Sequence, residues 1–374
     1  MVIKLHSTLA GLALAVSTFA AAQGPIKIAT AGPLTGDDAI WGIQVYQGVE
    51  MAVEDINAKG GLLGRKIELV KFDDKGESME AASVAQRIVN DPELVAVIGH
   101  VFSGCSLAAG PIYSRGKVPM MAVASTNPKV PSSGNYVFRI NLSDASAGAE
   151  MAKYTIQKLK AKKIAVIMGQ SDYCLGVFNA FEAKAKELGG SIATVQKFVP
   201  GQDKDFNVIL TSVKATRPDI ILVDGYASDA ALITQQARGL GIQTPLEIPD
   251  GAADPDFIKL AGKAADGVIA FSYFNPTIKD AKIQDLAKRY QAKYHNEILT
   301  YVPYAYDAMT AVAEAIRMAG KADRASIYEA LPKVKYAKGM TGEIAFVSRD
   351  RSAGWSVVLK VQNDKFNFLA LTTE

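Results

Sequence analysis

The residues best suited to binding chemistry lie in GHVFSGCS (Gly99 to Ser106). The apolar run LVAVIG (94–99) before them predicts a buried strand, and LAAGPIY after them is typical of a helix. Ser103 is therefore expected at a strand-to-helix turn, where its hydroxyl and the free N–H groups of the first helical turn favour a carboxylate or another anion. The alternative is an ordinary serine N-cap, and this segment alone does not decide between the two.

The segment VASTNPKV (Val123 to Val130) repeats this design. An apolar strand is expected to end at Ala124, Ser125 and Thr126, which offer hydroxyls and exposed backbone groups. Because the carboxyl ends of neighbouring parallel strands meet at one edge of a sheet, the two segments are predicted to face the same crevice.

The sequence contains few residues or motifs that could support catalysis. His100 and His295 lie far apart in the sequence and lack metal-ligand spacing, and GxSxG, phosphate-loop and strand-led GxGxxG patterns are absent. Asp73 and Asp74 follow a predicted strand and suit a metal or a ribose, but such pairs more often cap turns. Since no nucleophile, base and electrophile come together, we expect no enzyme, no metal and no cofactor.

Composition and charge restrict the class of protein. The chain has 374 residues, 49% of them hydrophobic, and only 2 Cys, which indicates a packed globular protein and excludes a disordered or disulfide-framework chain. The formal charge is +3 and the basic residues are scattered, so we expect no nucleic-acid partner.

Residues 1–22 have the pattern of a secretory signal peptide. Lys4 precedes the apolar run Leu9 to Ala22, which ends in small residues suited to cleavage. The run is shorter than the roughly 20 apolar residues that span a bilayer, so a membrane anchor is the less favoured alternative. No cysteine lies at the cleavage point to carry a lipid. We expect an exported protein whose remaining length fits two domains of roughly 150 residues each.

Short Val- and Ile-rich strands alternate with amphipathic helices along the rest of the chain. Strands are predicted at 26–30, 67–72, 94–99, 118–123, 163–168, 219–224 and 267–273. A helical face from Val45 to Ile56 ends at Gly60-Gly61, and Pro303 and Gly320 are predicted to open and close another helix. Because several strands are apolar throughout, the pattern predicts an α/β fold with doubly wound parallel sheets.

No linker rich in Gly, Ser or Pro divides the chain. Short segments are instead predicted to cross between two lobes at 139–146, 271–277 and 348–355. Several short crossings predict a hinge beside a cleft, and a cleft between lobes is where a ligand is expected.

These motifs, together with AGPLTG…WG (31–42), INAKGG (56–61) and IPDGAADP (248–255), closely resemble the periplasmic binding proteins for branched-chain amino acids. The resemblance spans essentially the whole mature chain. It implies a type I periplasmic binding protein fold of two Rossmann-like lobes joined by three hinge crossings. Lobe 1 is expected at 23–141 plus 275–350, and lobe 2 at 142–274 plus 351–374. It also implies a monomeric periplasmic receptor that closes on a small ligand and passes it to the membrane permease of an ABC transporter.

The resemblance assigns roles to residues at the polar end of the ligand. Ser103 and Thr126 match positions that receive the ligand carboxylate, and Ala124 matches a backbone carbonyl that receives its ammonium. Asp250 matches the acid that pairs with the ammonium, which is usually Glu in the Leu/Ile/Val binders. Because the Asp side chain is shorter by one methylene, the position or identity of the ligand is expected to differ.

The resemblance also assigns residues to the wall that would contact the ligand side chain. The matching residues are aromatic: Trp41, Phe102, Tyr173 and Tyr226, with Tyr304 as a weaker candidate. Their alternative role is plain core packing.

The cysteines depart from the family pattern. Relatives often carry a disulfide in the first lobe, but the matching positions are Gly76 and Phe102. Cys105 and Cys174 lie in different predicted lobes, where a bond would lock the hinge, so we expect two free thiols near the site.

The expected function is closure on an aliphatic amino acid, with Ser103 and Asp250 on opposite lobes. An aromatic or other small carboxylate is the alternative, because aromatic walls also stack on a ring. A secreted enzyme using Asp73, Asp74 or Asp250 is a rival from another class. A ligand-sensing lobe pair of a regulator would need a DNA-binding or membrane segment, which the sequence lacks.

Overall fold

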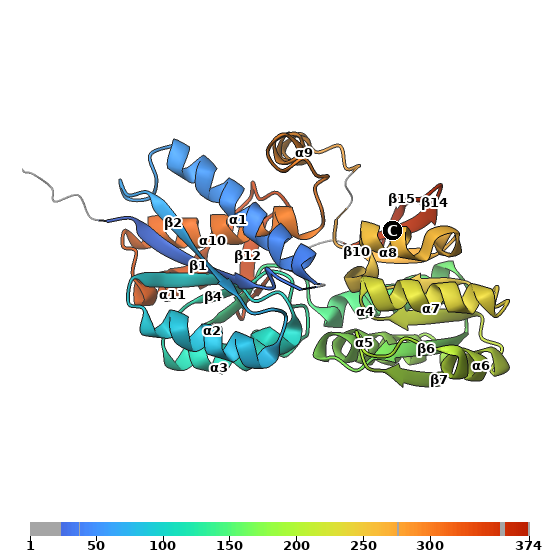
Figure 1. Ribbon diagram of the computed structural model, residues 1–374. Helices are drawn as coiled ribbons and strands as arrows, with labels where there is room; N and C mark the ends of the chain where they lie inside the picture. Colours follow the sequence, from blue (N-terminus) through green and yellow to red (C-terminus); the bar gives the residue numbers. More distant parts are fainter. Residues whose placement is uncertain (1–23, 37, 275–276, 352–355, 373–374) are drawn as a thin grey trace, which may run out of the picture.

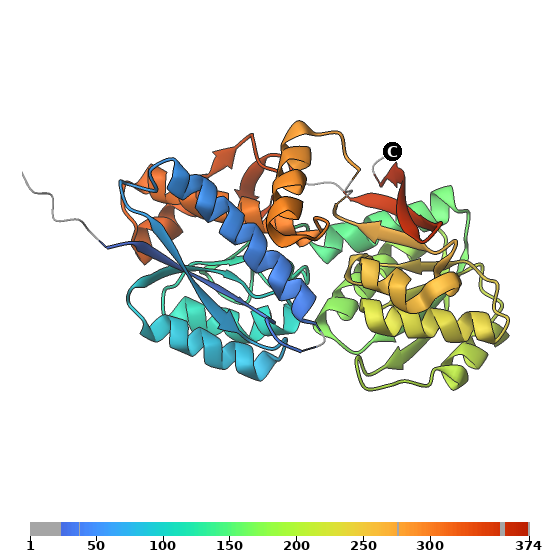
Figure 2. The same cartoon turned by 45° about the horizontal axis from the view of Figure 1, so that its top comes forward.

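The computed structural model describes residues 24–36, 38–274, 277–351 and 356–372. The predicted signal peptide therefore lies outside the described residues. Two separate sheets lie side by side, and each has helices against both of its faces (Figures 1 and 2). We call the first sheet with its helices the first half and the second sheet with its helices the second half.

The first half is built on five parallel strands in the order β2-β1-β3-β4-β5. Their bounds are β1 Ile26–Gly32, β2 Ile67–Asp73, β3 Leu94–Gly99, β4 Met120–Ala122 and β5 Val137–Arg139. Apolar residues of α1 (Ala39–Ala58) and α10 (Tyr301–Ala319) pack on one face, with α11 (Arg324–Ala330) beside them. Those of α2 (Ser78–Asn90) and α3 (Ser103–Arg115) pack on the other face.

The second half has seven strands in the order β15-β14-β10-β9-β8-β6-β7. The bounds are β6 Lys163–Gly169, β7 Ser191–Phe198, β8 Ile220–Asp224, β9 Leu246–Ile248, β10 Ile269–Ser272, β14 Val357–Gln362 and β15 Lys365–Leu371. The helices are α4 Asp144–Lys153, α5 Asp172–Glu187, α6 Asn207–Ala215, α7 Ala227–Gly239 and α8 Pro255–Ala261. A π-helical turn, Tyr154–Lys158, continues α4. Strands β6 to β10 pair in parallel, whereas β14 and β15 run antiparallel.

The predicted strands are all present, with adjusted ends. The apolar run at 94–99 is β3 as expected, but the strands predicted at 118–123 and 267–273 are shorter, at Met120–Ala122 and Ile269–Ser272. The antiparallel pair β14 and β15 and the small sheet of β11 (Lys335–Tyr336), β12 (Ile344–Val347) and β13 (Asp350–Arg351) were not predicted. β15 and the strands of the small sheet are mostly half-buried or exposed and lack the apolar run that marks a strand covered on both faces. In β14 four apolar residues are buried, but Lys360 interrupts the run.

Glycine and proline end and open the helices as the sequence predicts. Gly60 and Gly61 follow α1 with φ of +98° and +82°, values that an L side chain rarely adopts. Pro303 lies in the first turn of α10, where its missing N–H costs no helical hydrogen bond, and Gly320 ends that helix in the left-handed conformation.

The chain changes sheets after β5, after β10 and after β13. Parts of two predicted crossings, 275–276 and 352–355, lie outside the described residues. After β10 the chain forms α9 (Ala281–Tyr294), which packs against α1 through a cluster that includes Met51 and Ile283. Arg139 at the end of β5 donates to both carboxylate oxygens of Asp350 in β13, so an ion pair links two of the crossings. No helix in the described part of the chain is long and apolar enough to cross a membrane.

Candidate ligand-binding site

A small cavity lies between the two halves, where strands of both sheets end. Its volume is about 20 Å³, roughly the room for one water molecule. Its lining comes from both halves: Trp41, Val101, Phe102, Ser103, Ala124, Tyr173, Tyr226, Asp250, Gly251 and Tyr301. Every residue predicted for the site lies in this wall except Thr126 and the weaker candidate Tyr304.

Ser103 is the first residue of α3, directly after the turn that follows β3. The N-cap position belongs to Phe102, whose backbone is extended, so the interpretation of Ser103 as a simple N-cap is wrong. The Ser103 hydroxyl instead accepts a hydrogen bond from the N–H of Asn127 at 3.2 Å. Because a hydroxyl can accept and donate at once, Ser103 keeps a proton to donate toward the cavity.

The loop after β4 contributes Ala124 to the wall, with Thr126 behind it. Thr126 is fully buried, and its carbonyl accepts from Arg139 Nη1 at 2.6 Å and from the N–H of Asp144 at 2.9 Å. These bonds fix the loop, but they direct the Thr126 backbone toward the crossing. Contact between its side chain and a ligand therefore stays a prediction.

Asp250 faces the cavity from the turn after β9. Its Oδ1 accepts from the Tyr173 hydroxyl at 2.8 Å, and its Oδ2 accepts from the Tyr301 hydroxyl at 2.9 Å. Burial raises the pKa of Asp250 to about 6, although these two hydroxyl donors act in the opposite direction. Both oxygens are thus held in place, with one donor from each half.

Tyr301 was missed by the sequence analysis, which considered Tyr304 one helical turn later. Tyr304 is buried in the core of the first half, where its hydroxyl donates to the carbonyl of Tyr273 at 3.2 Å. Both residues lie on the inward face of α10, but only the first turn of that helix reaches the cavity. The sequence signal that marks this position is its place at the helix start, just before Pro303.

Aromatic rings form most of the remaining wall. The ring centroids of Tyr173 and Tyr226 are 5.5 Å apart in a stacked pair, and Phe102 meets Tyr226 edge-on at 5.3 Å. Trp41 lies 5.6 Å from Tyr301. Trp41, Phe102, Tyr173 and Tyr226 also line a groove of about 990 Å³ between the halves. They therefore separate the inner cavity from the wider groove.

Direct contacts join the halves around the cavity. The Asn127 side-chain amide donates to the carbonyl of Asp172 at the start of α5, in the other half. The Tyr301 to Asp250 hydrogen bond and the Phe102 to Tyr226 ring contact also cross between the halves. A group in the cavity would thus touch both halves at once.

Comparison with known proteins decides the family. A family model described as periplasmic binding protein matches residues 25–359. The chain belongs to the periplasmic binding protein family. Its fold, with two α/β halves around an interlobe cavity, is that of the type I members.

Named relatives of this periplasmic binding protein agree with that assignment. It is 30% identical to the leucine-, isoleucine-, valine-, threonine- and alanine-binding protein of Pseudomonas aeruginosa, over 92% of this chain and 91% of the relative. The leucine-binding protein LivK of Thermotoga maritima is similar in structure, with a TM-score of 0.86 and 34% identity over 92% of this chain and 98% of its own. LivJ of Streptococcus pneumoniae, solved in complex with isoleucine, gives a TM-score of 0.86 and 31% identity, over 93% and 99%.

The cysteines of this family member are free and buried, as expected. The positions that the resemblance assigns to a disulfide lie against each other. A Cβ on Gly76 would be 2.9 Å from Cε2 of Phe102, so the aromatic ring fills the space beside the glycine. In this chain the ring supplies the contact between the two segments without a covalent bond.

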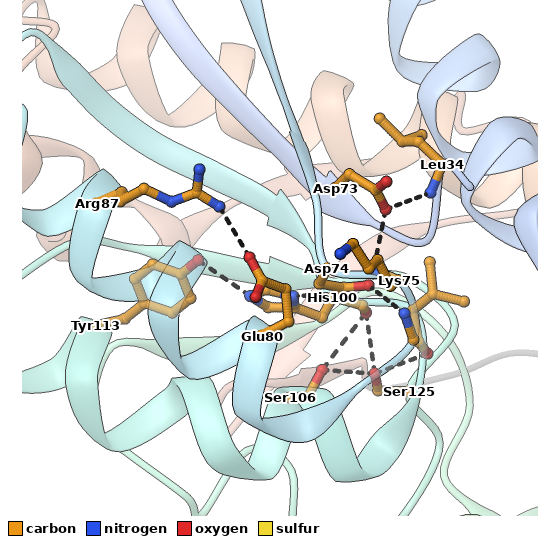
Figure 3. Close-up of polar contacts among 12 residues, drawn as sticks. Leu34, Asp73, Asp74, Lys75, Glu80, Arg87, His100, Ser106, Tyr113 and Ser125 are labelled. Atoms are coloured by element: carbon orange, nitrogen blue, oxygen red, sulfur yellow. Dashed lines mark hydrogen bonds and ion pairs between the residues drawn. The ribbon is translucent and has the colours of Figure 1, made fainter. Parts of the chain in front are cut away.

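The acids considered for metal or enzymatic chemistry have other partners. Asp73 accepts from the N–H groups of Leu34 and Lys75 and from the Thr35 hydroxyl, so it caps a turn as the alternative interpretation proposed. Asp74 contacts His100 in the interior (Figure 3). Within the described ranges, no group of three or more His, Cys, Asp or Glu residues is arranged to hold a metal ion.

Proposed function

We propose that this chain is the periplasmic receptor of an ABC importer, which closes on a small aliphatic amino acid and delivers it to the membrane permease. Its relatives are named as binding proteins for leucine, isoleucine and valine, which supports a ligand of this class. We further propose lobes at 23–141 plus 275–350 and at 142–274 plus 351–374, export directed by residues 1–22, action as a monomer and no catalytic activity.

The observation that carries this proposal is the polarity of the cavity. Asp250, the acid in the cavity wall, lies in the second half, while Ser103 and the first turn of α3 lie in the first half. An amino-acid zwitterion has one charged group for each half. Its ammonium pairs with the Asp250 carboxylate, and its own carboxylate accepts hydrogen bonds from the Ser103 hydroxyl and the N–H groups of α3. The aromatic wall then selects the side chain.

Ligand entry requires the halves to separate. The cavity has room for about one water molecule in the closed arrangement, and aromatic rings lie between it and the groove. A ligand that contacts both halves favours closure by the contacts it makes only in the closed state. Closure is then the signal that the permease reads.

A thermal-shift screen of refolded, ligand-stripped protein tests the proposal. L-leucine, L-isoleucine, L-valine and L-alanine are compared with their deaminated keto and hydroxy acids. A ligand at about 100 times its dissociation constant adds roughly 2.7 kcal/mol of stability, which shifts the midpoint by several degrees. A shift confined to the amino acids supports the zwitterion site, whereas equal shifts with the deaminated acids would refute the role of Asp250.

An aromatic carboxylate is the second candidate ligand, because four aromatic side chains surround the cavity and groove. Benzoate and phenylacetate belong in the same screen, and tighter binding of either than of any amino acid would favour this alternative. Catalysis is tested separately, by prolonged incubation of the ligand that binds best. Recovery of that ligand unchanged is the expected result, and a product that Asp250→Ala abolishes would contradict it.

A further inference from the structure

A buried histidine, His100, contacts Asp74 and Tyr113 in the interior of the first half (Figure 3). The side chains of His100 and Asp74 are both 0% exposed, with His100 Nδ1 2.5 Å from Asp74 Oδ2. The other ring nitrogen, Nε2, is 3.1 Å from the Tyr113 hydroxyl. None of these three residues lines the cavity, so direct ligand contact does not explain them. Burying such polar groups is costly, which makes a purely space-filling role a poor explanation.

The pair connects the ends of neighbouring strands. Asp74 follows β2: its N–H donates to the carbonyl of Gly32 at the end of β1, and its Oδ1 accepts from the N–H of Gly76. His100 follows β3, and its carbonyl accepts from the hydroxyl of Ser125 at 3.0 Å, in the loop after β4. One buried network therefore joins the carboxyl ends of four adjacent strands.

Each connected segment carries part of the cavity wall. His100 directly precedes Val101, Phe102 and Ser103. Ser125 directly follows Ala124. Gly76 leaves the space that the Phe102 ring occupies.

Tyr113 extends the network along α3. It lies on the same helix as Ser103, so the His100 ring is anchored both at the end of β2 and on the body of α3. This anchoring fixes where the first turn of α3 points. Hydrogen-bond donors weaken steeply when they are misaligned, so a small rotation of this helix would weaken a bound carboxylate.

We infer that Asp74 and His100 are positioning residues of the ligand site. The pair holds the first turn of α3 and the Ala124 loop in the geometry that receives the ligand carboxylate, without touching the ligand. The choice of ligand rests on the proposed function, but the positioning role rests on the hydrogen-bond network. Residues that orient metal ligands in the same way change affinity by about 10- to 100-fold when they are altered, and we expect an effect of that order at this site.

Asp74→Asn, Asp74→Ala and Tyr113→Phe test the inference in the full mature chain. The matched control is Asp307→Asn: Asp307 is a fully buried acid of the first half that accepts from the N–H groups of Met340 and Thr341 and does not line the cavity. Calorimetric titration with L-isoleucine and the melting temperature are measured for each variant. The expected results differ between the variants. We expect Asp74→Ala to weaken binding of L-isoleucine roughly ten- to a hundredfold. Asp74→Asn should lose less, because its single amide oxygen can still accept one of the two hydrogen bonds that the carboxylate accepts, from His100 or from the N–H of Gly76. The control should lose stability and keep its Kd within about twofold.

Amide hydrogen exchange of the ligand-free proteins supplies a readout that needs no ligand. Peptides covering 99–106 and 124–127 should exchange faster in Asp74→Asn and Tyr113→Phe, whereas Asp307→Asn should affect the segment around 340–341 instead. Failure of the wild-type chain to bind isoleucine would count against the proposed function and leave this exchange test intact. Unchanged exchange in both segments, or Kd values within twofold for variants destabilised as much as the control, would overturn the positioning role. Tyr113→Phe removes one hydroxyl, so it keeps the test valid if Asp74→Ala does not fold.

Discussion

The two sides of the cavity differ in how their polar groups are satisfied. On the first side, His100 bonds to both Asp74 and Ser125, and the groups that reach the wall are neutral. On the second side, Asp144 and Asp224 are buried near Asp250, and burial together with repulsion among the acids raises the pKa of both well above the ordinary range. The first side is thus built for rigidity, and the second keeps a surplus of acid that a cation would relieve. This asymmetry fits a zwitterionic ligand.

Removal of the Asp250 carboxylate should have the largest effect on amino-acid binding, because it removes the charged group of the second side. Asp250→Ala leaves a ligand ammonium buried without its partner, and breaking a buried ion pair costs about 3–5 kcal/mol. We expect amino-acid binding to weaken by more than a hundredfold in calorimetry, while a deaminated acid keeps its weak affinity. Unchanged amino-acid affinity in this variant would show that the ammonium does not lie at Asp250.

A variant at Glu247 tests whether the buried acids of the second side also lower the free energy of unfolding. This residue is fully buried in β9, its Oε2 lies 2.7 Å from the Thr155 hydroxyl, and burial raises its pKa to about 8. Its folded pKa is above its unfolded value, so its contribution to stability is fully present below about pH 4.5 and is lost as pH rises toward 8. Relative to the wild type, Glu247→Gln should therefore gain stability over that range, by a few kcal/mol at most. Urea unfolding at pH 5, 7 and 8.5 measures the difference, and a gap that does not change with pH would contradict this protonation state.

The pH dependence of binding sharpens the comparison further. Burial raises the pKa of Asp250 to about 6, so the free site carries a proton below that pH. Pairing with an ammonium requires the ionised form, and the proton must leave before the ligand binds. We expect Kd for an amino acid to rise about tenfold between pH 7 and pH 5, with proton release on binding near pH 6. Titrations in buffers of different ionisation enthalpy test this, and a Kd constant over this range would argue against a titrating acid.

The smallest expected effect comes from the aromatic ring on the first side. Phe102→Leu removes the edge contact with Tyr226 and widens the cavity beside Gly76. The open space should favour larger side chains by about 1 kcal/mol, the lower end of the range for a small change in an apolar pocket. Competition between L-valine and L-phenylalanine in wild type and variant measures it. An unchanged preference would place the side-chain pocket elsewhere.

The features predicted most accurately from the sequence are those that a local pattern of residues determines. The apolar runs marked strands that both faces of a sheet cover, and Ser103 and Ala124 were found because they follow two consecutive strands of one sheet. Tyr301 could not be found in this way, because it reaches Asp250 only through the packing of α10 across the cavity. The partnership of Asp74 and His100 was missed for the same reason: the residues are 26 positions apart, and only sheet order brings them together.

The aromatic wall between the cavity and the groove has a kinetic consequence. Because Phe102, Tyr173 and Tyr226 lie across the way out, a bound molecule leaves only after the halves part. Collective domain motions of this kind occur on the microsecond-to-millisecond scale. The residence time is then limited by how often the protein opens, so ligands that differ in affinity share one upper limit on their release rate.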